Sequence, residues 1–120
     1  MKAKDLCSYV FTVTQKSPKQ FRFTFVSRMQ TLCLDIIEHI YRANEMFVSG
    51  PSAKENYQRR LDFQHEALTE IKLLAYFSNL ALENQAILPK QFEQIAKLTA
   101  DCQNLLGAWM KSDRNRFNFK

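Results

Sequence analysis

Along most of the chain, apolar residues recur at intervals of three and four with polar residues between them, which is the pattern of amphipathic helices. This pattern predicts four helices, over about residues 4–14, 24–48, 52–84 and 89–112. The first of these is short and also rich in strand formers. Residues 113–120 do not continue this apolar pattern, so we expect a frayed or partner-ordered basic tail there.

Proline and glycine mark the expected connections between these helices. The first predicted helix is interrupted by Lys16-Ser17-Pro18-Lys19, because proline lacks an N–H donor and disfavours the helical conformation in the residue before it. Ser49-Gly50-Pro51 is expected to end the second helix. Pro89 suits the first position of the fourth helix.

The stripes predict which face of each long helix is buried. In the second helix, Thr24 is the expected N-cap, and the inward stripe runs from Met29 through Cys33 to Phe47. The third helix is expected to bury Leu61, Leu68, Ile71, Leu74, Ala75 and Leu82, and to expose Arg59, Arg60, Asp62, Glu66 and Glu70. The expected inward stripe of the fourth helix is Phe92, Ile95, Thr99, Cys102, Leu106 and Trp109.

Four amphipathic segments with short connections predict an all-α fold, an up-and-down antiparallel four-helix bundle, as a single domain over residues 1–120. Only five of the 120 residues are glycine or proline, which argues against an all-β fold. In such a bundle the first helix starts, and the fourth ends, at one pole. Lys16 and Lys19 then lie at the opposite pole.

Charge is unevenly distributed along the sequence. The whole chain has a net charge of +5, with 17 basic and 12 acidic residues. Residues 1–34 contain six basic residues and one acid, and residues 111–120 contain four basic residues and one acid. The middle of the chain is mildly acidic. The two basic ends are compatible with a polyanionic partner, either as one joint surface or as two separate patches.

Several kinds of catalytic site are excluded or disfavoured. The two glycines, Gly50 and Gly107, are too far apart in sequence for a phosphate-binding loop. A di-metal carboxylate site needs Glu-x-x-His on two helices, and Asp62-x-x-His65 is the nearest approach. We expect His39 and His65 to be solvated surface residues and the cysteines Cys7, Cys33 and Cys102 to be buried thiols. The sequence therefore predicts no catalytic residue, no metal site and no cofactor.

The expected location is the cytoplasm. The three cysteines are an odd number at wide spacing, which does not suggest a disulfide framework. The first residues lack the apolar run and cleavage site of a secretory signal. No stretch approaches the roughly 20 apolar residues of a membrane span, so we expect no membrane contact.

Basic residues alternate with aromatic ones in two segments, Phe21-Arg22-Phe23-Thr24-Phe25 and Arg114-Asn115-Arg116-Phe117-Asn118-Phe119-Lys120. Such mixtures bind nucleic acid, because cations contact phosphates and aromatic rings stack on unpaired bases. The first segment is equally typical of a hydrophobic staple, and the second of solvated charge that complements a helix dipole. The sequence leaves both alternatives open.

Three segments carry a resemblance to a known family. They are Lys16-Ser17-Pro18-Lys19 followed by Arg22-Phe23-Thr24, the run Leu34-Asp35-Ile36-Ile37-Glu38, and the ending Leu105-Leu106-Gly107-Ala108-Trp109-Met110-Lys111-Ser112. In their order and spacing the chain resembles bacterial four-helix-bundle proteins. This family includes the ribosomal-RNA intervening-sequence proteins and the accessory variability determinant (Avd) of diversity-generating retroelements.

The resemblance implies a function as well as a fold. Proteins like the retroelement accessory factor are non-enzymatic basic bundles that form homopentamers and bind the reverse transcriptase of the same element and its template RNA. The implied contacts for RNA, DNA or the reverse transcriptase are Lys16, Lys19, Arg22, Arg28, Lys111, Arg114 and Arg116. The alternative is a structural protein-interaction bundle that binds no nucleic acid.

Overall fold

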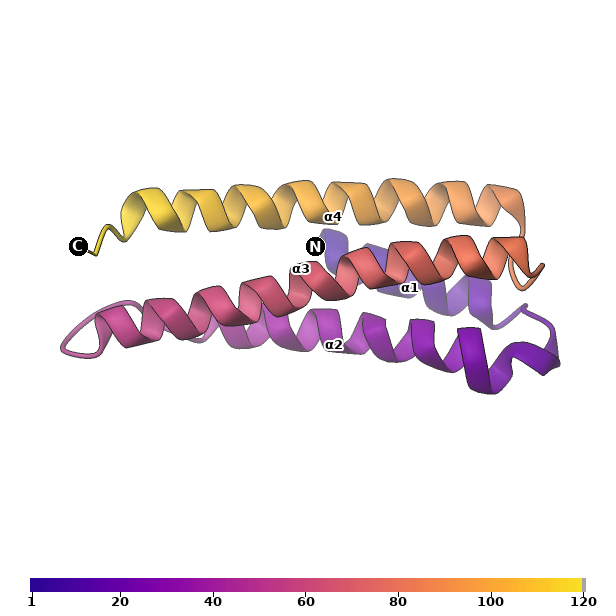
Figure 1. Cartoon of the computed structure of the whole chain (residues 1–120), viewed down its shortest axis with the longest axis horizontal. Helices are drawn as coiled ribbons and strands as arrows, with labels where there is room; N and C mark the ends of the chain where they lie inside the picture. Colours follow the sequence, from indigo (N-terminus) through magenta and orange to yellow (C-terminus); the bar gives the residue numbers. More distant parts are fainter. Residues whose placement is uncertain (120) are drawn as a thin grey trace.

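The chain is all α-helical in a computed structural model that describes residues 1–119 (Figure 1). Within that range it has no β-strand, which confirms the predicted all-α class. The elements are α1 (Lys2–Thr14), the 3₁₀-helix η1 (Lys19–Phe21), the π-helix η2 (Arg22–Val26), α2 (Ser27–Asn44), α3 (Ala53–Glu83) and α4 (Pro89–Arg116). None of the described helices is long and apolar enough to cross a membrane.

The helices lie along the long axis of a molecule that measures 52 × 22 × 20 Å (Figure 1). Helix α2 packs against α3, α3 packs against α4, and α1 packs against both α2 and α4. Helix α1 is the shortest of the α-helices, and its N-terminus lies near the middle of the long axis (Figure 1). Toward the α2–α3 connection, the described part of the chain is therefore built from α2, α3 and α4.

The core runs between all of these helices. Leu6 of α1, Met29 and Ile36 of α2, Ile71 of α3 and Ile95 of α4 are fully buried. On α3, seven of the eight buried residues recur at alternating steps of four and three: Arg60, Gln64, Ala67, Ile71, Leu74, Ser78 and Ala81. The eighth, Glu70, is hydrogen-bonded to His39 of α2. Because α3 contacts both α2 and α4, its buried face is broad.

The predicted inner stripe of α3 is correct at Ile71 and Leu74, which are fully buried, but lies one residue off elsewhere. Leu61 and Leu68 were expected in the core but are only half-buried, and of the two Leu68 packs against the core. Arg60 and Glu70 were expected on the solvent face, which is wrong, because only 8% of Arg60 and 9% of Glu70 are exposed. Both buried side chains contact polar partners on neighbouring helices.

Helix α2 is shorter than the predicted helix 24–48. Thr24 is not its N-cap, because it lies within the π-helix η2, where its Oγ1 donates to the Phe21 carbonyl at 3.4 Å. Helix α2 ends at Asn44 rather than near Gly50, and the side chain of Phe47 is 66% exposed instead of buried. The Asn56 amide donates to the Phe47 carbonyl at 3.0 Å, which ties the connecting loop to α3.

The connections on either side of α3 use the left-handed backbone region. Gly50 has a φ of 71°, a conformation that only glycine adopts without steric cost. At the other end, Gln85 has a φ of 63°, and the Ala86 N–H donates to the Ala81 carbonyl at 2.8 Å. This bond belongs to a Schellman motif, which satisfies carbonyls that the end of α3 leaves open. Helix α4 then starts at Pro89.

The C-terminal segment is not a frayed tail. Helix α4 was expected to end near residue 112 but continues to Arg116, because Asp113 is anchored in the interior and is only 1% exposed. The last residue of the predicted tail, Lys120, lies outside the described residues.

A buried ion pair holds this end of α4 against α3. Asp113 Oδ2 accepts hydrogen bonds from Arg60 Nε at 2.7 Å and from Gln64 Nε2 at 2.9 Å, and Asp113 Oδ1 accepts one from the Arg60 guanidinium at 3.1 Å. The guanidinium carbon lies 4.9 Å from the Trp109 ring centroid and 6.0 Å from that of Phe117. The charged groups are thus paired and enclosed by aromatic rings.

Replacing Asp113 with Asn should destabilise the protein strongly. The substitution leaves the Arg60 charge buried without a counter-charge, and breaking a buried pair in this way costs about 3–5 kcal/mol. Urea unfolding followed by circular dichroism measures the loss. Arg116→Ala is the matched control, because Arg116 reaches Asp113 at 3.5 Å with a side chain that is 63% exposed, and its loss should cost no more than about 1 kcal/mol. Equal losses in the two variants would contradict the assignment.

Candidate nucleic-acid interface

The structure divides the basic residues that the sequence singled out into two groups. All seven are exposed. Lys16, Lys19, Arg22 and Arg28 lie between the end of α1 and the first turn of α2, whereas Lys111, Arg114 and Arg116 lie on the last turns of α4. Figure 1 shows these segments at opposite ends of the long axis. The two groups therefore form two separate basic patches.

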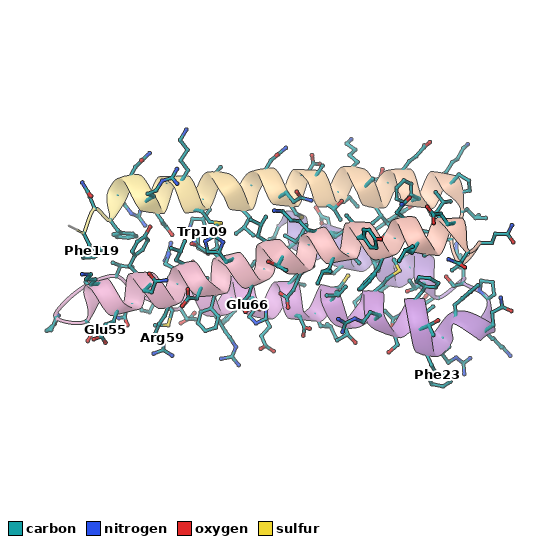
Figure 2. The ribbon with its side chains drawn as sticks, in the orientation of Figure 1. Phe23, Glu55, Arg59, Glu66, Trp109 and Phe119 are labelled. Atoms are coloured by element: carbon teal, nitrogen blue, oxygen red, sulfur yellow. The ribbon has the colours of Figure 1, made fainter. Side chains whose placement is uncertain are left out.

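The patch at η1 and η2 is partly engaged with the protein itself. The Phe21 and Phe25 rings pack on each other, with centroids 5.8 Å apart, and both lie against the core. The guanidinium of Arg28 lies 5.7 Å from the Phe77 ring on α3. Phe23 instead points outward and is 87% exposed (Figure 2). Two of the three phenylalanines thus pack on the core, and the third remains available for contact.

The patch at the end of α4 combines cations with an ordered group of aromatic rings. Tyr57 of α3 lies 5.7 Å from Phe117 and 5.9 Å from Phe119, between ring centroids. The Arg116 guanidinium lies 4.6 Å from the Phe117 ring. Phe119 is 41% exposed and borders a groove that is also lined by Lys54 and Glu55 (Figure 2). We call this surface the C-terminal patch: Lys54, Tyr57, Lys111, Arg114, Arg116, Phe117 and Phe119.

The C-terminal patch has a positive charge that its surroundings do little to neutralise. Lys54, Lys111, Arg114 and Arg116 are exposed, and the acid that borders the groove is Glu55. The other acid of this region, Asp113, is paired with the buried Arg60 and also lies 3.5 Å from the exposed Arg116, so it offsets little of the patch's charge. Exposed cations around partly exposed rings bind phosphates and stack on unpaired bases.

The residues that order this patch were not predicted from the sequence. Arg60, Gln64 and Asp113 are polar, and the amphipathic pattern therefore assigned no interior role to them. Their positions in the sequence did indicate burial, because Arg60 and Gln64 extend the spacing of four and three residues along α3 toward its N-terminus. Asp113 likewise lies four residues after Trp109, at the next step of the α4 stripe.

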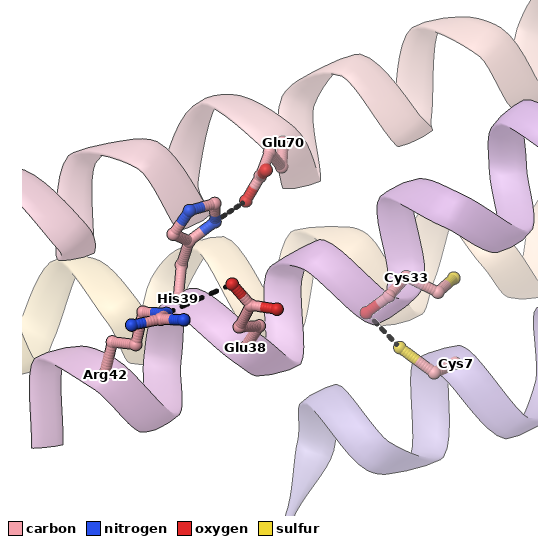
Figure 3. A network of polar contacts seen from close by, with 6 residues as sticks. All are labelled: Cys7, Cys33, Glu38, His39, Arg42 and Glu70. Atoms are coloured by element: carbon pink, nitrogen blue, oxygen red, sulfur yellow. Dashed lines mark hydrogen bonds and ion pairs between the residues drawn. The ribbon is translucent and has the colours of Figure 1, made fainter. Parts of the chain in front are cut away.

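A second polar group lies between α2 and α3. His39 was expected to be a solvated surface residue, but its Nδ1 lies 2.7 Å from Glu70 Oε1 and its side chain is only 21% exposed (Figure 3). Burial raises the pKa of Glu70, and the hydrogen bond with His39 opposes that shift. Glu66 is close enough to these two residues for all three to be candidate ligands of a metal ion.

The three cysteines are buried thiols, as the sequence predicted. The Cys7 thiol donates to the Cys33 carbonyl at 3.2 Å (Figure 3). The hydrogen bond with Cys7, together with burial, raises the pKa of Cys33. Burial raises the pKa of Cys102 to about 11. The hydrogen bond with Cys33 instead lowers the pKa of Cys7. All three sulfurs are nevertheless buried, which is a poor setting for nucleophilic catalysis.

Comparison with known protein families and with curated proteins finds no match to this chain in either.

The native cysteines should resist alkylation. With a pKa near 11, Cys102 has only about one thiolate per thousand molecules at pH 8, and all three sulfurs are shielded by the core. Iodoacetamide labelling followed by intact-mass spectrometry should therefore be far slower in buffer than in urea. Rapid modification of Cys7 in buffer would contradict the packing of α1.

Proposed function

We propose that this chain is a non-enzymatic, oligomeric accessory protein that binds nucleic acid. The C-terminal patch is the observation that carries this proposal: Arg116 lies against the Phe117 ring, Phe117 and Phe119 pack on Tyr57, and Arg114 is exposed on the same last turn of α4. The aromatic rings supply stacking surfaces and the arginines neutralise phosphates. Single-stranded segments of a structured RNA fit this combination best, because their bases are unpaired and open to stacking.

The proposed architecture is an up-and-down antiparallel four-helix bundle. Its support is the pattern of packing, in which each α-helix contacts two others and the pairs α1–α2, α2–α3, α3–α4 and α1–α4 close a ring. Short connections between successive helices fit the same topology. In this arrangement α1 covers only part of the groove between α2 and α4.

The resemblance to the retroelement accessory factors extends the proposal to partners. On this basis the chain is a cytoplasmic homopentamer that binds the reverse transcriptase of its own element and that element's RNA. The basic patch of Lys16, Lys19, Arg22 and Arg28 is then a second contact, for the same RNA or for the polymerase. All four side chains are exposed at the end of the molecule opposite the C-terminal patch, so one long ligand or two different ligands fit.

A second candidate function is a protein-interaction bundle, favoured by the outer face of η2 and α2. Large apolar side chains are exposed along it, with Phe23 at 87%, Leu34 at 59% and Tyr41 at 67%. Leu34 and Tyr41 are seven residues apart, so they lie on one side of α2. Exposed apolar surface of this kind is typical of a site that binds another protein or another copy of the chain.

Binding of a fluorescently labelled structured RNA, and of matched DNA, should show a strong dependence on salt in anisotropy titrations. Removing two phosphate contacts with the double variant Arg114→Ala/Arg116→Ala should weaken binding and lower the log-log salt slope by about two. The control variant Lys72→Ala/Lys97→Ala removes the same charge from exposed positions on α3 and α4 and should bind like the wild type. No binding by the wild type at low salt would contradict nucleic-acid binding and leave the protein-interaction bundle as the candidate function.

A charge on the outer face of α2 should alter self-association. Leu34→Glu places a carboxylate on the exposed apolar surface and should shift the assembly toward smaller species in sedimentation velocity at several concentrations. Ala100→Glu adds the same charge at an exposed position of α4 and should leave the distribution unchanged. A wild-type protein that is monomeric at all concentrations would contradict the oligomer.

A further inference from the structure

Three side chains between α2 and α3 bring together ligand types that transition-metal ions prefer. One ring nitrogen of His39 and one carboxylate oxygen from each of Glu66 and Glu70 lie within 4.8 Å of one another. Glu66 and Glu70 are one turn apart on α3, and His39 lies opposite on α2. Figure 2 labels Glu66 near the middle of α3, and Figure 3 shows His39 reaching toward Glu70.

The position of these groups is set by their surroundings. The His39 ring stacks on Phe63, with centroids 6.2 Å apart and an angle of 26° between the planes, which limits its rotation. Glu70 is only 9% exposed. Glu66 is exposed, so its carboxylate can rotate without disturbing the core. Two ligands are therefore held in place and one can adjust.

The electrostatics of the cluster favour a cation. Glu70 is buried, and a second carboxylate, that of Glu66, lies beside it in the cluster. A buried carboxylate beside like charges is costly unless a positive group neutralises it. Arg42, on the next turn of α2 after His39, is engaged by Glu38, whose Oε2 accepts from Arg42 Nε at 3.1 Å (Figure 3).

We propose that His39, Glu66 and Glu70 form a binding site for a divalent transition-metal ion, with Zn²⁺ as its best-suited occupant. Zinc binds imidazole nitrogen and carboxylate oxygen at about 2.0–2.2 Å, and three protein ligands leave its fourth position to water. Tetrahedral ligands at that distance lie about 3.4 Å apart, so modest side-chain rotation closes the observed cluster around the ion. The nitrogen ligand disfavours Mg²⁺ and Ca²⁺.

Binding replaces the hydrogen bond between His39 and Glu70. The proton shared by His39 Nδ1 and Glu70 Oε1 leaves to solvent, and the metal takes its position between the two atoms. The ion then links α2 to α3 through ligands on both helices. This site does not involve the C-terminal patch or any cysteine, so it is independent of nucleic-acid binding.

The test is calorimetric titration of the full chain with ZnCl₂, with Glu66→Gln as the key variant. This substitution removes a ligand at an exposed position and keeps the His39–Glu70 contact, so the fold is retained. We expect one ion per wild-type chain and an affinity at least about tenfold lower in the variant, the smallest loss seen when even an outer partner of a metal ligand is removed. His39→Ala should lose more.

Two controls separate this site from other zinc ligands. His65→Ala removes an exposed imidazole next to Glu66 in sequence and should bind zinc like the wild type. Cobalt(II) bound by nitrogen and oxygen gives visible bands without the intense near-ultraviolet absorption of cobalt–thiolate bonds. Zinc should also raise the wild-type Tm but not that of Glu66→Gln. Unchanged affinity in Glu66→Gln, a lower affinity in His65→Ala, or a thiolate band would overturn the proposal.

Discussion

The buried pair of Arg60 and Asp113 is the constraint on which the C-terminal end of α4 depends. Removing two charges from water is costly, and the cost is met here because each oxygen of Asp113 accepts a hydrogen bond from Arg60 and Gln64 adds another. Trp109 and Phe117 exclude water around the guanidinium. Helix α4 consequently extends to Arg116, and the aromatic residues after Asp113 pack on Tyr57 instead of fraying.

This constraint shapes the candidate interface. A frayed basic tail would lose conformational entropy when it ordered on a ligand, whereas the C-terminal patch presents its cations and rings already positioned. The patch at η1 and η2 is built differently, because its phenylalanines mostly serve the core and leave Phe23 as the exposed ring. The two patches are thus unequal in chemistry, which favours the C-terminal patch for the proposed stacking of bases.

Sequence periodicity was sufficient for the helical class and for burial of the cysteines, because apolar spacing reports both directly. It was insufficient for polar residues at interior positions. Arg60, Gln64 and Asp113 continue the stripes of α3 and α4, but because they are polar the predicted core did not include them. His39 borders the stripe between Ile36 and Ala43 and meets Glu70 only through packing of α2 on α3, a long-range pairing that one helix pattern does not encode.

Two buried polar contacts of α3, Arg60 with Asp113 and Glu70 with His39, also explain how the long helices keep one register. Leucine and isoleucine stripes tolerate a shift by one turn at modest cost, since apolar contacts are non-directional. A shift of that size would leave Arg60 without Asp113 and Glu70 without His39, each a buried group without its partner. The Arg60–Asp113 contact fixes the register of α3 against α4, and the Glu70–His39 contact fixes that of α3 against α2. Helix α3 therefore sets the positions of α2 and α4. Helix α1 packs on those two helices, so its position depends on both.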